Sequence, residues 1–254
     1  MDPLAFIVAL AREAGELLRA RLDDPREVAQ KQPRDLVTDA DRASEALIVE
    51  RIRSAYPAAS VLGEESGVFR GSGDERFIVD PLDGTTNYAH RYPLFCVSIA
   101  YEVAGRIEAG VVYAPVLDEL FAARRGGGAT LNGSLIGVSA VAAVADAMVG
   151  TGFNPAAYAR NGAYFARLSE HAQAVRRDGS AALDLAFVAC GRYDAFWEWD
   201  LKAWDVAAGS LLILEAGGSV SAIDGGVLDI SAGSIVVSNG LVHREMVSLL
   251  RTVG

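Results

Sequence analysis

The stretch Phe77-Ile78-Val79-Asp80-Pro81-Leu82-Asp83-Gly84-Thr85-Thr86-Asn87 decides how the whole chain is interpreted. An apolar run ends at Asp80, Pro81 removes one amide donor, and Asp83 precedes a glycine that permits a tight turn. The run predicts a buried strand that carries two carboxylates into a loop at its end. Neighbouring carboxylates repel each other unless a cation lies between them, and Mg²⁺ prefers such oxygen ligands. An ordinary strand with an Asp-Gly turn has the same local pattern, so this stretch alone leaves both interpretations open.

The composition indicates a globular protein with an ample core. The chain has 254 residues, of which 51% are hydrophobic and 22% are charged. We expect one compact domain over residues 1–254, with an N-terminal half at 1–139 and a C-terminal half at 140–254. No apolar run is long enough to cross a bilayer, and the first residues lack the basic region of a secretory signal. A cytoplasmic protein without a membrane partner is therefore predicted.

Charge and cysteine content narrow the possible partners. The formal net charge of −10 argues against nucleic-acid binding, which needs basic surface. An anionic substrate would need metal ions that locally reverse the field. Cys96 and Cys190 lie in apolar segments and are expected to be buried thiols of a reducing compartment. The three histidines are isolated from one another, which makes a zinc site improbable.

The N-terminal half is predicted to combine two helices with an antiparallel sheet. Apolar residues recur at helical spacing near the start of the chain and again after Thr38. A Gly triplet at 126–128 lacks the Lys-Ser/Thr of a phosphate-binding loop, so a turn is expected there. Residues 70–75 are expected to form a loop. The predicted helices are 3–22 and 39–55, and the predicted strands are 60–62, 94–104, 106–114, 120–123 and 134–138.

The C-terminal half alternates strands with helices, which suggests a layered α/β arrangement. The fold class predicted from both halves is α+β to α/β. The predicted strands are 147–152, 174–177, 193–197, 220–223 and 235–237, and the predicted helices are 155–171, 180–189, 203–216 and 241–252.

Three further acidic clusters have ordinary structural explanations when each is taken alone. Asp39 and Asp41 at a helix start complement the helix dipole. Glu64 and Glu65 follow a strand and would normally form a solvated corner. Asp205, just after Trp204, would be a first-turn or capping acid of its helix.

Taken together, these segments resemble the inositol monophosphatase family of Mg²⁺-dependent sugar and polyol phosphatases. The resemblance spans nearly the whole chain. The Asp-Pro-Leu-Asp-Gly-Thr element is highly specific, and its order relative to Gly-Glu-Glu and Trp-Asp makes coincidence improbable. The resemblance implies a layered αβαβα sandwich of the sugar-phosphatase type. The matching segments are 35–41, 63–66, 80–87, 179–182 and 204–209.

The resemblance also implies two or three Mg²⁺ ions. Glu64, Asp80 and the Leu82 carbonyl would hold the first ion, and Asp80, Asp83 and Asp205 the second. A weaker third ion would depend on Glu64 and water. Paired metals can stabilise both the attacking and the leaving oxygen of an in-line displacement, which requires no histidine or cysteine nucleophile.

The remaining implied roles concern water, phosphate and alcohol. Asp41 and Thr85, with Glu64, would position and deprotonate the attacking water, and the phosphate would lie against Gly84 and Thr85. The alcohol side would be lined by Gly179, Ser180, Ala181 and Glu198. Asp83, Asp205 and Glu198 would contact the substrate, with Asp83 and Glu198 bonding its hydroxyl groups.

The predicted activity is Mg²⁺-dependent hydrolysis of a phosphate monoester of inositol or a similar polyol, by in-line attack of metal-activated water. Thr86 favours inositol phosphate, since relatives acting on adenosine 3′,5′-bisphosphate, and many acting on histidinol phosphate, carry Lys there. The alternatives are a phosphatase for histidinol phosphate, fructose 1,6-bisphosphate or NADP, or a regulatory binding protein that keeps the fold. The resemblance further suggests a homodimer and inhibition by Li⁺.

Five further residues lie near the motifs. His90 and Arg91 are expected to be structural. Arg177, with its neighbour Arg176, either attracts the phosphoester or is surface charge. Asp178 is predicted at the edge of the substrate pocket, where it would repel a second phosphate and argue against bisphosphate substrates.

Overall fold

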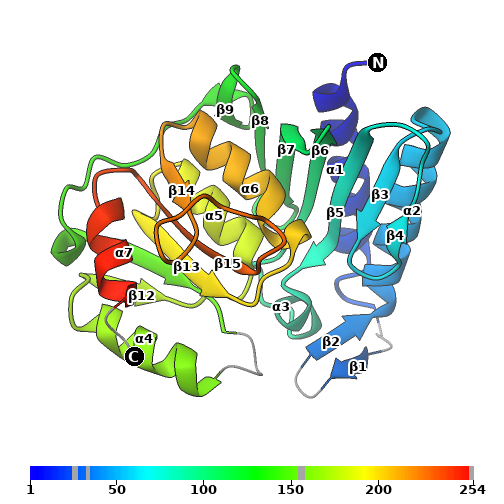
Figure 1. Cartoon of the computed structure of the whole chain (residues 1–254). Helices are drawn as coiled ribbons and strands as arrows, with labels where there is room; N and C mark the ends of the chain where they lie inside the picture. The colour runs from blue at the N-terminus through cyan, green and yellow to red at the C-terminus, as the bar shows by residue number, and fades with distance from the viewer. Residues whose placement is uncertain (25–27, 33–34, 154–157, 252–254) are drawn as a thin grey trace.

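The computed structural model describes residues 1–24, 28–32, 35–153 and 158–251. Its layers follow the order helix, sheet, helix, sheet, helix (Figure 1). The helices are α1 (Pro3–Ala20), α2 (Asp39–Ala55), α3 (Thr85–Ala89), α4 (Tyr158–Ser169), α5 (Ala181–Ala189), α6 (Ala203–Glu215) and α7 (His243–Arg251), with a 3-10 turn η1 at Val144–Asp146.

The larger sheet has eight strands in the order β10-β9-β8-β7-β6-β5-β3-β4. All its neighbouring pairs are antiparallel except β3 and β5, which run parallel. Its strands are β3 (Ser60–Gly63), β4 (Gly67–Phe69), β5 (Glu75–Asp83), β6 (Cys96–Val103), β7 (Arg106–Ala114), β8 (Glu119–Arg124), β9 (Gly128–Leu131) and β10 (Ser134–Leu135).

The smaller sheet has five strands in the order β12-β11-β13-β15-β14, and β11 runs parallel to both of its neighbours. Its strands are β11 (Met148–Thr151), β12 (Ala174–Arg176), β13 (Ala195–Trp199), β14 (Ser219–Ser221) and β15 (Ser234–Ser238). A separate hairpin joins β1 (Val28–Gln32) to β2 (Asp35–Thr38), directly before α2.

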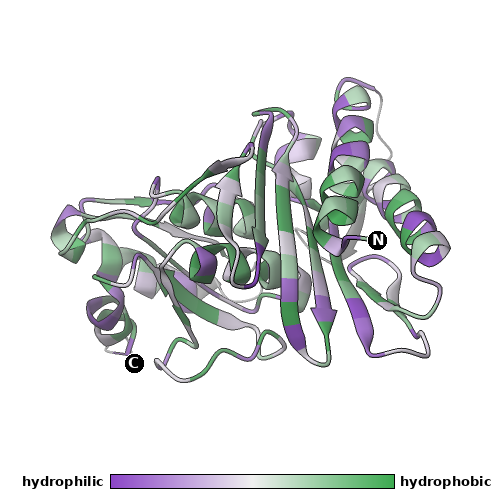
Figure 2. Ribbon diagram, turned by 90° about the horizontal axis from the view of Figure 1, so that it is seen from above, coloured by the Kyte–Doolittle hydropathy of each residue, from purple (hydrophilic) through white to green (hydrophobic). Residues whose placement is uncertain are grey.

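Three apolar clusters hold these layers together. The first lies between the sheets, where α5 and α6 contact Ile78 and Val112 on one side and Phe196 on the other. The second packs α1 and α2 on the outer face of the larger sheet, and the third packs α4 and α7 on the smaller sheet. Helix α5 is buried all round, because both of its faces meet a sheet. In Figure 2 the central strands are largely in the hydrophobic colour. The outer helices carry both hydrophobic and hydrophilic colours along their length.

Most sequence predictions of elements are confirmed, with shifts at the ends. The helix at 39–55 has the predicted bounds, while the first helix ends at Ala20 instead of residue 22. The strand predicted at 134–138 is only Ser134–Leu135, and the loop predicted at 70–75 ends one residue earlier because Glu75 begins β5. The first residues of the helix predicted at 155–171 lie outside the described residues. Cys96 is fully buried as expected, but Cys190 is only partly buried.

The elements that the sequence did not predict are short or polar. Strand β9 has four residues and begins at Gly128, and α3 has five residues. The hairpin of β1 and β2 contains a polar segment without alternating hydrophobicity, so no strand pattern was available to detect it.

The strand of the opening motif differs from its prediction in one decisive way. It continues to Asp83 and contains a β-bulge: Asp80 pairs with Ser98 and Asp83 with Cys96, so three steps along β5 oppose two along β6. In a regular strand, residues three apart point to opposite faces. The extra residue resets this alternation and brings Asp80 and Asp83 to the same face of the sheet. That face meets α5 and α6, since Ser98 Oγ donates to the Trp204 carbonyl and Cys96 Sγ lies 3.6 Å from Ser180 Oγ.

Candidate active site

Three carboxylates converge at the bulge. Asp80, Asp83 and Asp205 each offer an oxygen, and these atoms all lie within 4.8 Å of one another. The first two come from β5 and the third from the first turn of α6, so a strand and a helix 120 residues later supply one cluster. Asp80 is only 2% exposed, whereas Asp83 and Asp205 are partly exposed.

Backbone and side-chain donors fix the orientation of all three carboxylates. Asp83 Oδ2 accepts hydrogen bonds of 2.7 Å from both Ser180 Oγ and the Ala182 amide. The Leu82 amide donates to Asp80 Oδ1 over 3.0 Å, and the Lys202 amide donates to Asp205 Oδ2 over 2.6 Å. The last bond means that Asp205 is both the first-turn acid of α6 and a member of the cluster.

Burial raises the pKa of all three members of the cluster, and neighbouring carboxylates raise those of Asp80 and Asp205 further. For Asp80 the pKa lies well above its usual range because of burial first, and then the charges of Glu64, Asp83 and Asp205. For Asp205, burial and then the charge of Asp83 raise the pKa to about 8. Carboxylates this close repel one another and offer only oxygen atoms as metal ligands, which suits a hard divalent cation. A bound cation would remove both the repulsion and the rise in pKa. Asp80, Asp83 and Asp205 are the groups positioned to hold it.

A hydrogen-bonded pair, Asp41 and Thr85, lies beside the cluster. Thr85 Oγ1 donates to Asp41 Oδ1 over 2.8 Å and also lies 3.2 Å from the Leu82 carbonyl oxygen. Thr38 occupies the other oxygen of Asp41, donating from its amide over 2.8 Å and from Oγ1 over 2.6 Å. Asp41 is fully buried, and this burial raises its pKa despite the donors. The carboxyl is therefore a better proton acceptor than an exposed aspartate.

The glycine of the motif allows the chain to turn between these groups. Gly84 has φ +95° and precedes α3, and a Cβ there would lie 3.0 Å from the Leu94 carbonyl oxygen. An L side chain at this position would be strained by the positive φ and would crowd the Leu94 carbonyl oxygen. The turn therefore leads the chain directly from Asp83 of the cluster to Thr85 of the hydrogen-bonded pair.

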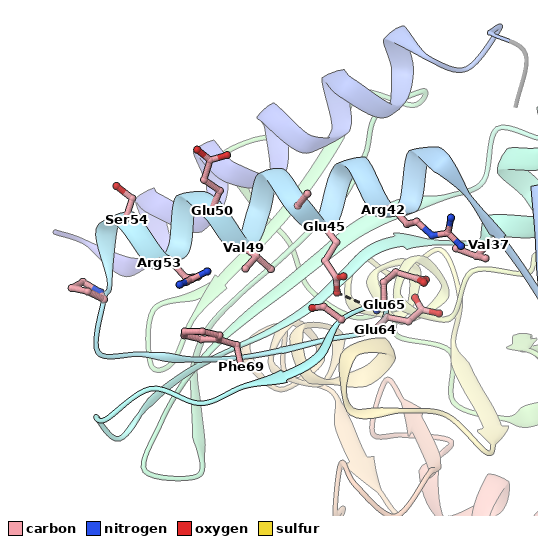
Figure 3. A pocket seen from close by; sticks show the side chains of 13 residues that line it. Val37, Arg42, Glu45, Val49, Glu50, Arg53, Ser54, Glu64, Glu65 and Phe69 are labelled. Atoms are coloured by element: carbon pink, nitrogen blue, oxygen red, sulfur yellow. Dashed lines mark hydrogen bonds between the residues drawn. The ribbon is translucent and has the colours of Figure 1, made fainter. Parts of the chain in front are cut away.

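The structure places Glu64 beside the three-carboxylate cluster but not within it. Its charge is close enough to be the second largest cause that raises the pKa of Asp80. Glu64 lines a separate hollow of about 970 Å³ between α2 and the β3–β4 hairpin (Figure 3).

Sequence reasoning missed Glu45, which supports the loop that carries Glu64. Glu45 is 4% exposed, and its Oε1 accepts a hydrogen bond of 3.1 Å from the Glu65 amide, drawn in Figure 3. Gly63 has no side chain because a Cβ there would lie 2.1 Å from that oxygen. The available signal was spacing, since Glu45 follows Asp41 by four residues and thus shares its helix face.

A cleft of about 240 Å³ opens next to the cluster. Predicted substrate contacts Gly179, Ser180, Ala181, Glu198, Asp83 and Asp205 line it, while Gly84 and Thr85 lie in the turn next to them. Glu198 is 8% exposed and is packed tightly, because a Cβ on Gly152 would lie 2.1 Å from its Oε2. Burial and then the charges of Asp205 and Asp83 raise the pKa of Glu198 well above its usual range.

The cleft also contains Asp184, which sequence reasoning did not select. It lies in α5, four residues after Ser180, and is 1% exposed. Its spacing from Ser180 was the available signal, but apolar residues surround it in the sequence and no motif marked it.

The neighbouring residues Arg176, Arg177 and Asp178 have different surroundings in the structure. Arg177 lines the cleft and stacks over Phe153 at 5.2 Å, whereas Arg176 is exposed and bonds the carbonyl of its own neighbour Val175. Asp178 lies between the cleft-lining residues Arg177 and Gly179, and its own carboxylate accepts a hydrogen bond from the Tyr193 hydroxyl. The charge of Asp178 still reaches the cleft, since after burial it is the largest cause that raises the pKa of Asp184.

Comparison with known proteins identifies the relatives of this site. Residues 2–254 match the inositol monophosphatase family. The chain belongs to that family. An inositol-1-monophosphatase of Rhizobium meliloti is 46% identical over 94% of this chain and 89% of its own length. The Nus factor SuhB of Pseudomonas aeruginosa is 43% identical over 99% and 97%. The structure of an inositol monophosphatase from Anabaena (Nostoc) superposes with a TM-score of 0.90 at 42% identity, covering 99% of this chain and 96% of that one.

Membership of the inositol monophosphatase family supports a phosphatase, and this family is metal-dependent. The fold expected for it, mixed sheets with layered helices, is the one observed. Among the described residues, no helix combines the length and apolar character that a bilayer crossing requires.

Proposed function

We propose that the protein hydrolyses a phosphate monoester of inositol or a similar polyol and requires Mg²⁺. The observation that carries this proposal is the three-carboxylate cluster lying next to the Asp41–Thr85 pair. One group suits divalent cations and the other suits proton transfer, so the two parts of a metal-assisted hydrolysis lie side by side.

The protein's own residues have separable roles in this proposal. When bound, the metal ions supply Lewis acidity that activates water and neutralises phosphoryl charge. Thr85 Oγ1 accepts the proton of the attacking water while passing its own to Asp41, whose raised pKa favours this transfer. The Thr38 donors keep Asp41 in a single orientation throughout.

The leaving alcohol occupies the cleft between α5 and β13. Ser180 and Ala182 hold Asp83 from one side, and Glu198 faces the same space. Several carboxyl groups around one small cleft suit an alcohol with several hydroxyl groups, because each hydroxyl can serve as donor. This chemistry favours a polyol over an apolar alcohol.

A panel of phosphate esters tests the proposal. Inositol 1-phosphate, histidinol phosphate, fructose 1,6-bisphosphate, NADP and a simple aryl phosphate are assayed with and without Mg²⁺, and with and without Li⁺. We expect Mg²⁺-dependent release of phosphate, highest kcat/KM for inositol phosphate, and inhibition by Li⁺. A tenfold preference for another ester would replace inositol phosphate as the substrate, and Mg²⁺-independent turnover would contradict the metal chemistry.

A Nus-factor role is the second candidate, because relatives of nearly equal identity carry the name Nus factor SuhB. This role need not depend on turnover. A variant without phosphatase activity, such as Asp83→Asn, should still replace the wild-type protein in cells if the role is regulatory. Failure of an inactive but folded variant to do so would assign the cellular role to the phosphatase activity.

We also propose that the chain is a cytoplasmic homodimer that binds neither nucleic acid nor membrane. Light scattering behind size-exclusion chromatography measures the mass directly, with 26.8 kDa expected for a single chain. A monomer at micromolar concentration would contradict the dimer.

A further inference from the structure

The carboxyl group of Asp184 has an environment that ordinary buried acids avoid. It is 1% exposed, and no hydrogen-bond partner is recorded for its Oδ1 among the described residues. A buried carboxyl without a partner destabilises a folded protein, because it loses hydration and gains no hydrogen bond in return. Such a group is retained where something outside the protein supplies the missing partner.

The position of Asp184 indicates where that partner comes from. The residue lies one helical turn beyond Ser180 and Ala181 in α5, and it lines the same cleft as Glu198. Burial first, and then the charges of Asp178, Glu198 and Asp83, raise its pKa well above the usual range. The charges that act on Asp184 are thus all negative, and among the described residues no donor is hydrogen-bonded to its Oδ1.

We propose that Asp184 is a substrate-binding residue that forms a hydrogen bond with a hydroxyl group of the leaving alcohol. A hydroxyl is suited to this place because it can donate to a carboxylate or accept from a protonated carboxyl. The bond selects esters whose alcohol carries a second hydroxyl beside the phosphorylated one. This inference deepens the proposed function and rests on it.

The contrast with Asp178 strengthens the assignment. Both acids lie near the start of α5, but Asp178 has its own partner in the Tyr193 hydroxyl and does not line the cleft. Asp178 is therefore a matched control, with the same charge, a neighbouring position and a structural partner.

The test compares two substrates in four proteins: the wild type, Asp184→Ala, Asp184→Leu and Asp178→Asn. The substrates are inositol 1-phosphate and an aryl phosphate without further hydroxyls, both at saturating Mg²⁺. We expect the Asp184 variants to lose about 10- to 100-fold in kcat/KM for inositol phosphate, the usual effect of one hydrogen bond to a charged group. Activity toward the aryl phosphate should change less than about threefold, and Asp178→Asn should affect both esters equally.

Stability gives a second, independent readout. Because the carboxyl has no recorded protein partner at Oδ1, its replacement should leave the melting temperature unchanged or raise it. A structural role would predict the opposite. Misfolding of both Asp184 variants would overturn the inference, and so would an equal loss for both esters.

Other outcomes are also distinguishable. If the wild type hydrolyses no ester in the presence of Mg²⁺, the proposed function fails, whatever the variants do. If it hydrolyses both esters, but the Asp184 variants need much more Mg²⁺ for each, the residue serves a cation and the hydroxyl contact is wrong.

Discussion

Two groups of carboxylates line one cleft, a metal-facing group (Asp83 and Asp205) and an alcohol-facing side (Glu198 and Asp184), and the protein provides different partners for them. Asp83 of the metal-facing group accepts bonds from Ser180 and Ala182, and Asp41 accepts bonds from Thr38 and Thr85. On the alcohol-facing side, Asp184 Oδ1 has no such donor within the described residues. The protein itself orients the carboxylates that we propose for the chemistry, whereas on the alcohol-facing side the proposed ligand would supply the missing partner of Asp184.

The metal-facing group should be the more sensitive of the two to substitution. Asp83→Asn removes one charge from the cluster but keeps the size of the side chain, so it weakens cation binding without disturbing packing. We expect kcat/KM for every ester to fall about 100- to 1,000-fold. Circular dichroism should show an unchanged fold. Asp205→Asn should behave alike, and near-normal turnover in both variants would refute the assigned metal site.

Turnover should require the hydroxyl group of Thr85 in the Asp41–Thr85 pair. Thr85→Ala removes the donor to Asp41, and we expect kcat to fall about 100-fold or more with a small change in KM. Thr85→Ser keeps the hydroxyl and should recover most of the rate. Thr130→Ala, whose hydroxyl bonds only the Ala122 carbonyl far from the cleft, is the control. Equal rates for the alanine and serine variants would remove Thr85 from the proton path.

A substitution that displaces Glu198, on the alcohol-facing side, should change KM more than kcat. A Cβ at Gly152 would lie 2.1 Å from Glu198 Oε2, so Gly152→Ala must displace that carboxyl. We expect KM for inositol phosphate to rise about tenfold while activity toward an aryl phosphate changes little. Gly162→Ala, where a Cβ meets nothing within 4 Å, is the matched control. An unchanged KM would show that Glu198 does not touch the alcohol.

The smallest expected effect is on stability as a function of pH. The pKa of Asp205 is about 8 in the metal-free fold against an ordinary value of 3.8, so the folded metal-free protein binds the extra proton. The stability gained from this group is complete below about pH 4 and is lost as the pH rises toward 8. Mg²⁺ competes with that proton. Saturating Mg²⁺ should therefore raise the melting temperature about 3 °C more at pH 8 than at pH 5. Asp205→Asn should reduce this difference, and an equal shift at both pH values would contradict the raised pKa.

The sequence singled out the residues that the structure brings together because they lie in specific local motifs. Asp80 and Asp83 lie at the end of an apolar strand, Asp205 begins an apolar helix, and Thr85 belongs to the Asp-Pro-Leu-Asp-Gly-Thr motif. The resemblance to inositol monophosphatases then assigned their roles. The side chains that orient them were harder to find, since Glu45 and Asp184 are single acids within helices and have no motif of their own.

The main helices and strands, their apolar faces and the identity of the three cluster aspartates could be predicted from the sequence alone. Only the tertiary structure decided that Asp80 and Asp83 share a face, because the bulge at Pro81 and Leu82 changes an alternation that residue spacing alone cannot reveal. It also decided that Asp178 is paired with Tyr193 while Asp184 faces the cleft. The physical reason is the same in both cases: a carboxyl's role depends on which donors and charges surround it in space, and these come from elements far apart in the chain.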